Sequence, residues 1–150
     1  MPFFIGGSGK KRIMKMVAQY GDYLNLPFTP IADLRSIFQA LQVHCDNFKR
    51  NFNDIGKSYF TTVFIADNDE ELEREFDRIS KRSNRTVEEV KTHLKSSEYP
   101  GSFIGYPEDL IERIKFLYDE FNFDYFHLMF PYPRDLEFSK RFGEKVISKI

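Results

Sequence analysis

A chain of 150 residues with a formal net charge of −1 is long enough to form one domain with a sizeable hydrophobic core. Its Lys and Arg residues are spread along the chain, which argues against a general nucleic-acid binder, and 30% charged residues without a long apolar run argue against a membrane span. The start of the chain lacks the charged-then-apolar order of a secretory signal, and a single cysteine, Cys45, forms no internal disulfide, so we expect a reducing, cytoplasmic compartment. Seventeen Phe and eight Tyr predict a large apolar surface, buried inside the chain or against a partner.

The first predicted unit is a short buried strand, a glycine-rich turn and a helix. The strand covers Pro2–Ile5, the turn is Gly6-Gly7-Ser8-Gly9, and the helix begins at Ser8 or Gly9 and ends near Tyr20. Glycines let the backbone approach an anion closely, and the first turn of a helix offers free N–H groups with partial positive charge. This order predicts a phosphate cradle. A tight turn that simply needs small residues explains the same pattern equally well.

Strand and helix patterns alternate through the middle of the chain. Apolar residues recur at helical spacing in one segment, and a later segment is dense in β-branched and aromatic residues. We expect a strand at Asp22–Leu26, a helix at Ala32–Arg50, a turn at Asn51–Gly56 and a strand at Tyr59–Ala66. The next helix is expected to begin after a cap at Asp67 or Asn68.

The last third of the chain carries clear helix signals. Thr86 and Glu89 have the spacing of a capping box, and Pro107 suits the first position of a helix. After the capped helix we expect a loop at Tyr99–Gly105 and a helix at Pro107–Phe121. A strand at Asp124–Phe130 and a closing helix at Leu136–Ile147 follow.

The order of these elements predicts an α/β fold with parallel strands. Strands that alternate with helices are joined by crossovers, and such connections are typical of parallel pairing. Four strands in one layer form either a small open sheet or half of an eight-stranded, TIM-type (β/α)8 barrel.

Several motifs, in chain order, resemble one known family. The motifs are Pro2–Arg12, Val17–Asp22 with Asn25, His44-Cys45 followed by the Asn53–Ser58 turn, Ile104–Glu108, Ile111–Arg113 and Asp124–Leu128. Together they resemble the luciferase-like monooxygenases, which are barrel enzymes that use FMN or the deazaflavin coenzyme. The resemblance covers nearly the whole chain.

The resemblance implies that residues 1–150 form a single domain, the C-terminal half-barrel with strands five to eight, and that the first half would precede Met1. It implies a flavin- or deazaflavin-dependent oxidoreductase or monooxygenase that acts on a small organic substrate. In this reading Gly6, Gly7, Ser8, Gly9 and Lys10 hold the cofactor phosphate, and Asn25 contacts the cofactor or substrate, but no catalytic acid or base is identified.

Two alternatives remain open. The chain is a non-catalytic, truncated half-barrel that associates with itself or with a separate first half, or it is a small open-sheet module that binds a phosphate-bearing ligand. An unclosed half-barrel has two unpaired strand edges, so a homo-oligomer or a partner half-barrel is expected.

The remaining polar candidates have mostly structural interpretations. We expect His44 to be structural, Cys45 to lie in the core, and Asp22 to cap or bond the backbone at the start of its strand. His127 is the strongest histidine candidate, because its alternation with apolar neighbours points it into the barrel, whereas His93 is expected on a helix surface. Arg134 and Asp135 follow the last strand and either reach a ligand or cap a helix, and no metal-ligand spacing is present.

Overall fold

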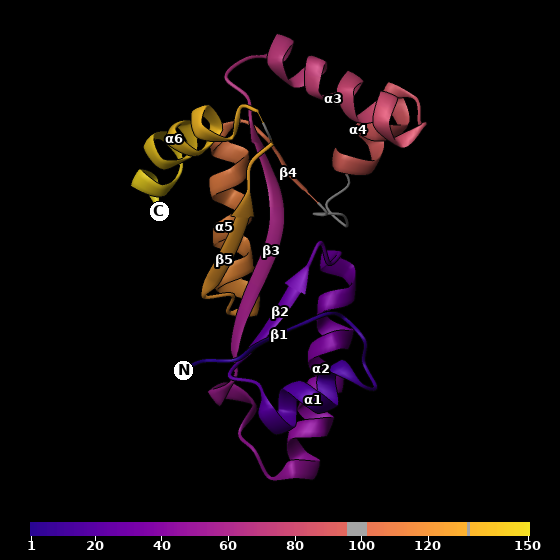
Figure 1. Cartoon of the computed structure of the whole chain (residues 1–150), viewed down its shortest axis with the longest axis vertical. Coiled ribbons are helices and arrows are strands. Elements are labelled where there is room, and N and C mark those ends of the chain that lie inside the picture. The colour runs from indigo at the N-terminus through magenta and orange to yellow at the C-terminus, as the bar shows by residue number, and fades with distance from the viewer. Residues whose placement is uncertain (96–101, 132) are drawn as a thin grey trace.

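The computed structural model describes residues 1–95, 102–131 and 133–150 (Figure 1). Within these ranges the strands are β1 (Phe4–Gly6), β2 (Tyr23–Pro27), β3 (Gly56–Ile65), β4 (Ser102–Gly105) and β5 (Tyr125–Met129). The α-helices are α1 (Ile13–Tyr20), α2 (Ile31–Phe48), α3 (Asp69–Ser83), α4 (Val87–Lys95), α5 (Pro107–Phe121) and α6 (Asp135–Lys145). Two 3-10 helices are η1 (Phe52–Asp54) and η2 (Ile147–Lys149).

The sheet is parallel throughout, as the alternation of strands and helices predicted. β1 pairs with β2, β2 with β3, and β3 with β5, in a register that aligns Gly6, Asn25, Ser58 and Tyr125 across the four strands. Helical segments connect these strands in chain order. The predicted α/β class is therefore confirmed.

β4 is a strand that the sequence did not predict. It lies in the segment expected to be a loop, of which residues 99–101 are outside the described ranges. Thr62 of β3 pairs with both Ser102 of β4 and Met129 of β5. β4 and β5 therefore flank β3 on opposite edges, and β4 continues along the edge that β2 occupies lower down. Four residues carry too little pattern to predict this strand, which depends on pairing with the long β3.

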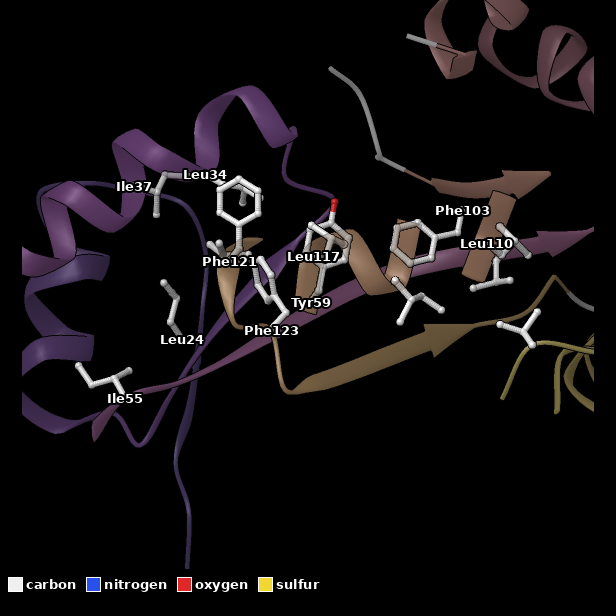
Figure 2. Packing of buried hydrophobic residues seen from close by; sticks show 14 of the residues in the cluster. Leu24, Leu34, Ile37, Ile55, Tyr59, Phe103, Leu110, Leu117, Phe121 and Phe123 are labelled. Atoms are coloured by element: carbon white, nitrogen blue, oxygen red, sulfur yellow. The ribbon is translucent and has the colours of Figure 1, made fainter. Parts of the chain in front are cut away.

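The helices form where apolar residues recur on one face. α2 buries Leu34, Ile37, Leu41 and Cys45, and α5 buries Leu110, Ile114, Leu117 and Phe121. Between these helices and the sheet, the Tyr59 ring lies between Phe123 and Phe103, at centroid distances of 5.4 and 5.7 Å (Figure 2). In Figure 1, α1 and α2 lie beside β1 and β2, whereas α3 and α4 stand near the opposite end of β3.

The first helix begins later than expected. It was predicted to start at Ser8 or Gly9 and starts instead at Ile13. Residues 10–12 form a turn, and the N–H groups of Ile13 and Met14 both donate to the Gly9 carbonyl, at 3.1 and 3.2 Å. This wide turn places the basic residues 10–12 ahead of the helix and lengthens the loop after β1.

The second large difference between the predicted and observed elements is the start of β3. This strand begins at Gly56, within the predicted turn, because Gly56 pairs with Tyr23 of β2. The rest of that turn forms η1. The remaining predicted elements within the described ranges are confirmed to about two residues at each end, the usual uncertainty of such boundaries.

Candidate functional site

The glycine turn after β1 holds Gly7 in a conformation that suits glycine alone. Its φ is +128°, a value that L-residues with a side chain rarely adopt. Its N–H donates to the carbonyl of Asn25 in β2 at 3.0 Å. The turn is therefore fixed to the sheet at the carboxyl end of β1.

The N–H groups that follow Gly7 are free. Among the described residues, the backbone N–H groups of residues 8–12 donate no hydrogen bond, and all five residues are exposed. Three of them, Lys10, Lys11 and Arg12, carry positive side chains. Successive free N–H groups beside a helix N-terminus form a concavity that favours an anion. The structure thus has the free N–H groups and positive charge that the sequence pattern indicated. They belong to the loop before α1 rather than to the first turn of the helix.

Asn25 lies beside this turn. A Cβ built on Gly6 would lie 3.7 Å from the Asn25 amide nitrogen, Nδ2. The Ser58 hydroxyl donates to Asn25 Oδ1 at 3.1 Å, which fixes the orientation of the amide. No hydrogen bond from Asn25 Nδ2 is made within the described chain, so this donor is available beside Gly6. Asn25 lies in the middle of β2 and not at its end, because the strand continues to Pro27.

His44 anchors the turn from the other side. Its Nε2 donates to the Lys10 carbonyl at 3.0 Å, a bond between α2 and the turn. Arg50 adds bonds from its guanidinium to the carbonyls of Val17 and Ala18 in α1, at 3.3 and 3.4 Å. His44 therefore has the structural role that was expected, and the Lys10 backbone is held while its side chain remains exposed.

The face of the sheet that points away from α1, α2 and α5 carries an aromatic cluster. The Phe4 ring stacks on Tyr23 at 4.3 Å and meets Tyr125 and His127 at 5.6 and 5.5 Å. In a flat sheet β1 and β5 would be three strand spacings, about 14 Å, apart. Their rings meet because the sheet curls around this side, which we call the concave face. By strand alternation it carries Phe4, Tyr23, Asn25, Ser58, Phe60, Tyr125, His127 and Met129.

Sequence reasoning missed this cluster, although the alternate aromatic positions of the last strand were visible. His127 does lie on the concave face, and its Nε2 is buried without a hydrogen-bond partner among the described residues. Phe28, just after β2, has a φ of +47°, an unusual backbone conformation for a bulky residue, and its ring meets Phe60 at 5.2 Å.

The other candidates have structural roles. Asp22 accepts a bond from the Phe3 N–H at 2.7 Å, as expected for a residue that bonds backbone at the strand start. Cys45 is buried, and burial raises the pKa of its thiol. Arg134 is held by Glu137 through two bonds of 3.0 and 2.7 Å, and Asp135 begins α6 without capping it. The side chain of His93 lies outside the described parts of the chain.

A large cleft lies away from the glycine turn. A cleft of about 870 Å³ is lined by α3, α4, β4 and α5, including Asp69, Glu73, Tyr106 and Arg113, and includes none of the glycine-turn residues. In the described ranges, no cluster of His, Cys, Asp and Glu side chains could hold a metal ion, and no helix is long and apolar enough to cross a membrane.

Comparison with known proteins finds similarity in structure only. No protein-family model and no curated protein matches the sequence. A riboflavin lyase, crystallised with a modified FMN and riboflavin, matches with a TM-score of 0.70 and 16% identity, over 97% of this chain and 42% of that chain. A long-chain alkane monooxygenase matches at 0.66 and 14%, over 97% and 40% of the two chains. The coenzyme F420-dependent tetrahydromethanopterin reductase of Methanopyrus kandleri matches at 0.66 and 13%, over 99% and 51%.

These solved structures are members of the luciferase-like monooxygenase family, so the resemblance drawn from the sequence motifs is confirmed at the level of the fold. This chain spans about half the length of each of them. The chain therefore has the parallel α/β fold of the luciferase-like, FMN- and F420-dependent enzymes.

Proposed function

We propose that this chain is the C-terminal half-barrel of a luciferase-like flavin- or deazaflavin-dependent oxidoreductase or monooxygenase, and that its glycine turn holds the cofactor phosphate. β1, β2, β3 and β5 then correspond to barrel strands five to eight, and α3, α4 and β4 form an insertion between the last two. Four parallel strands that are adjacent in the sheet and curl around one face support this interpretation. So does the coverage of nearly all of this chain but only about half of the similar structures.

The free N–H groups of residues 8–12 carry the cofactor assignment. A phosphate bears two or more acceptor oxygens, and this turn offers five unpaired backbone donors together with the Lys10, Lys11 and Arg12 side chains. Asn25 Nδ2 adds a neutral donor on the concave face, beside Gly6. The residues present therefore fit the phosphate end of FMN or of the deazaflavin coenzyme.

The role of this chain is to bind and orient the cofactor. A bound flavin or deazaflavin supplies the hydride or oxygen chemistry, and the protein positions its reactive ring and excludes water. The turn fixes the phosphate at the carboxyl end of β1, which leaves the ring to lie toward the concave face, as in barrels whose sites form at the carboxyl ends of their strands. We assign no catalytic acid or base in this chain, and the substrate is a small organic molecule of unspecified class.

A titration with FMN, riboflavin and the deazaflavin coenzyme tests the proposal. FMN should bind at least about tenfold more tightly than riboflavin, which lacks the phosphate, because charge-assisted hydrogen bonds contribute about 1.5–3 kcal/mol. Ser8→Asp places a negative charge among the free N–H groups and should abolish that preference. Ser83→Asp, at the exposed end of α3, adds the same charge far from the turn and should leave it intact. Equal affinity of wild type and Ser8→Asp for FMN would exclude the turn as the phosphate site.

A non-catalytic role is the second candidate, favoured by the uncovered concave face. In that case the chain associates through this face and binds no flavin in the same titration.

A further inference from the structure

The concave face is unusual for a parallel sheet because large apolar side chains on its two outer strands, β1 and β5, remain exposed. Phe4, Tyr125 and Met129 on this face are 38%, 49% and 47% exposed. Purely parallel sheets occur almost only with both faces covered, and apolar side chains in such a position are rarely left in water. A further layer of protein is therefore expected on this side.

The outer edges of β1 and β5 are also open. In the described chain β1 pairs only with β2, and the outer edge of β5 is unpaired because β5 pairs only with β3. Unpaired N–H and C=O groups at an edge favour pairing with another strand. The Phe4–Tyr125 contact shows that the sheet curls, which turns the two edges toward the same side of the molecule.

Two copies satisfy these edges at once. Because all strands are parallel, β5 of one copy can pair with β1 of the other, and the reverse pair forms by the same rotation. This is the reciprocal contact that a twofold interface requires. Four strands from each copy then give the eight of a closed barrel. The chain spans about half of the similar structures, so two copies also match their size.

The side chains at the interface fit this arrangement. On the opposite face of β5, beside its free edge, a groove of about 450 Å³ between α5 and the C-terminal segment is lined by Phe126, Leu128, Tyr118, Ile147 and Ile150 among others. The exposed parts of Phe4, Tyr125 and Met129 contribute roughly 100 Å² each, since such side chains bury about 150–250 Å² when fully covered. A stable dimer buries roughly 800 Å² per partner, so the paired edges and the groove must supply the remainder.

We propose that the concave face and the free edges of β1 and β5 form an interface with a second copy of this chain, and that the two copies close one eight-stranded barrel. The closed barrel surrounds His127, whose Nε2 is buried without a hydrogen-bond partner in the described chain. With a net charge of −1 per chain, the two copies repel each other little. This inference rests on the half-barrel of the proposed function but not on flavin binding.

Sedimentation equilibrium of the 150-residue chain tests the interface. The wild type should sediment at twice the 17.8 kDa of one chain. Met129→Glu buries a carboxylate without a partner in the closed barrel and should weaken dimerisation at least about 100-fold, because such burial costs several kcal/mol. Val43→Glu replaces a 54%-exposed side chain on α2, a helix of the opposite face, and should dimerise like the wild type. Circular dichroism and thermal unfolding establish that both variants fold.

A wild type that is monomeric at all concentrations overturns the inference, including one that associates only when the first half of a similar barrel is added. A dimer that Met129→Glu leaves intact also overturns it, because the contact then lies elsewhere. The flavin titration separates the two proposals. A dimer that binds no flavin contradicts only the cofactor assignment, whereas a monomer that binds FMN contradicts only the interface.

Discussion

Gly56 and Tyr23 offer a sharp test of the concave face. A Cβ built on Gly56 would lie 2.3 Å from Cε1 of the Tyr23 ring, and 2.6 and 2.7 Å from Cδ1 and Cζ. Carbon atoms pack at about 3.5–4.0 Å, so Gly56→Ala forces the ring to move by more than about 1 Å. The ring cannot move freely, because Phe4 stacks on it at 4.3 Å with an interplanar angle of 13°.

The expected cost follows from this geometry. Overpacking of this kind destabilises by about 1–3 kcal/mol. The φ of Gly56 is not in the left-handed region, so the backbone there tolerates alanine. Apart from the clash, Gly56→Ala should stabilise the fold by about 0.4–1 kcal/mol, because alanine has less conformational freedom than glycine in the unfolded chain. In a Tyr23→Ala background the clash is gone, and Gly56→Ala should be neutral or stabilising. The unfolded-state gain is common to both backgrounds and cancels, so the coupling free energy between the two substitutions is expected at about 1–3 kcal/mol.

Urea denaturation of the wild type, the two single variants and the double variant measures this coupling. Circular dichroism is the appropriate signal because the chain has no Trp. If Gly56→Ala costs the same in both backgrounds, within about 0.5 kcal/mol, the Tyr23 ring does not lie over Gly56 and the aromatic cluster is wrongly described.

Two further predictions concern the charged side chains of Glu71, which is partly buried, and Lys57, which is buried. Burial alone would raise the pKa of Glu71, but bonds from the Asp67 N–H and from Arg141 outweigh it and lower the pKa. A carboxyl group whose pKa is lower in the folded than in the unfolded state stabilises the fold at pH values above its unfolded pKa. The unfolding free energy of the wild type should therefore fall more than that of Glu71→Gln as the pH drops below about 4.3. Parallel curves of unfolding free energy against pH for the two proteins would contradict this. Lys57 is buried over the Phe52 and Phe38 rings at 4.7 and 5.7 Å, and burial lowers its pKa. At alkaline pH the Lys57 amine therefore binds more protons in the unfolded chain than in the folded one. The unfolding free energy of the wild type should rise relative to that of Lys57→Met between neutral pH and about pH 10. A constant difference between the two proteins would refute the lowered pKa.

Local signals in the sequence predicted much of the fold. The Asn68 side chain caps α3 by accepting the Glu71 N–H at 3.0 Å, and Thr86 and Glu89 form the expected capping box. Pro107 begins α5 as predicted. These features involve residues at most four positions apart, so a single sequence contains all the information that they need.

Features that depend on distant segments escaped prediction. β4 and the early start of β3 exist because of pairing partners tens of residues away. The concave cluster requires the register of β1 and β5, which no local pattern contains. At the candidate site the glycine turn was visible, but its free N–H groups belong to residues 8–12 because the Gly9 carbonyl accepts from both Ile13 and Met14. The bond from His44 to Lys10 likewise joins residues 34 positions apart.

The pairing of β5 with β3 has a consequence for how the chain folds. The Lys57 N–H donates to the Asp124 carboxylate across 67 positions, whereas the β1–β2 and β2–β3 pairs, such as Phe4–Tyr23 and Tyr23–Gly56, join residues that are 19 and 33 positions apart. Contacts between distant segments form slowly, because a long loop must close first. During synthesis the first sixty-odd residues can assemble their three strands while β5 has yet to be made. One edge of β3 then stays open through that interval, which makes the nascent chain most prone to aggregation just before its last strand arrives.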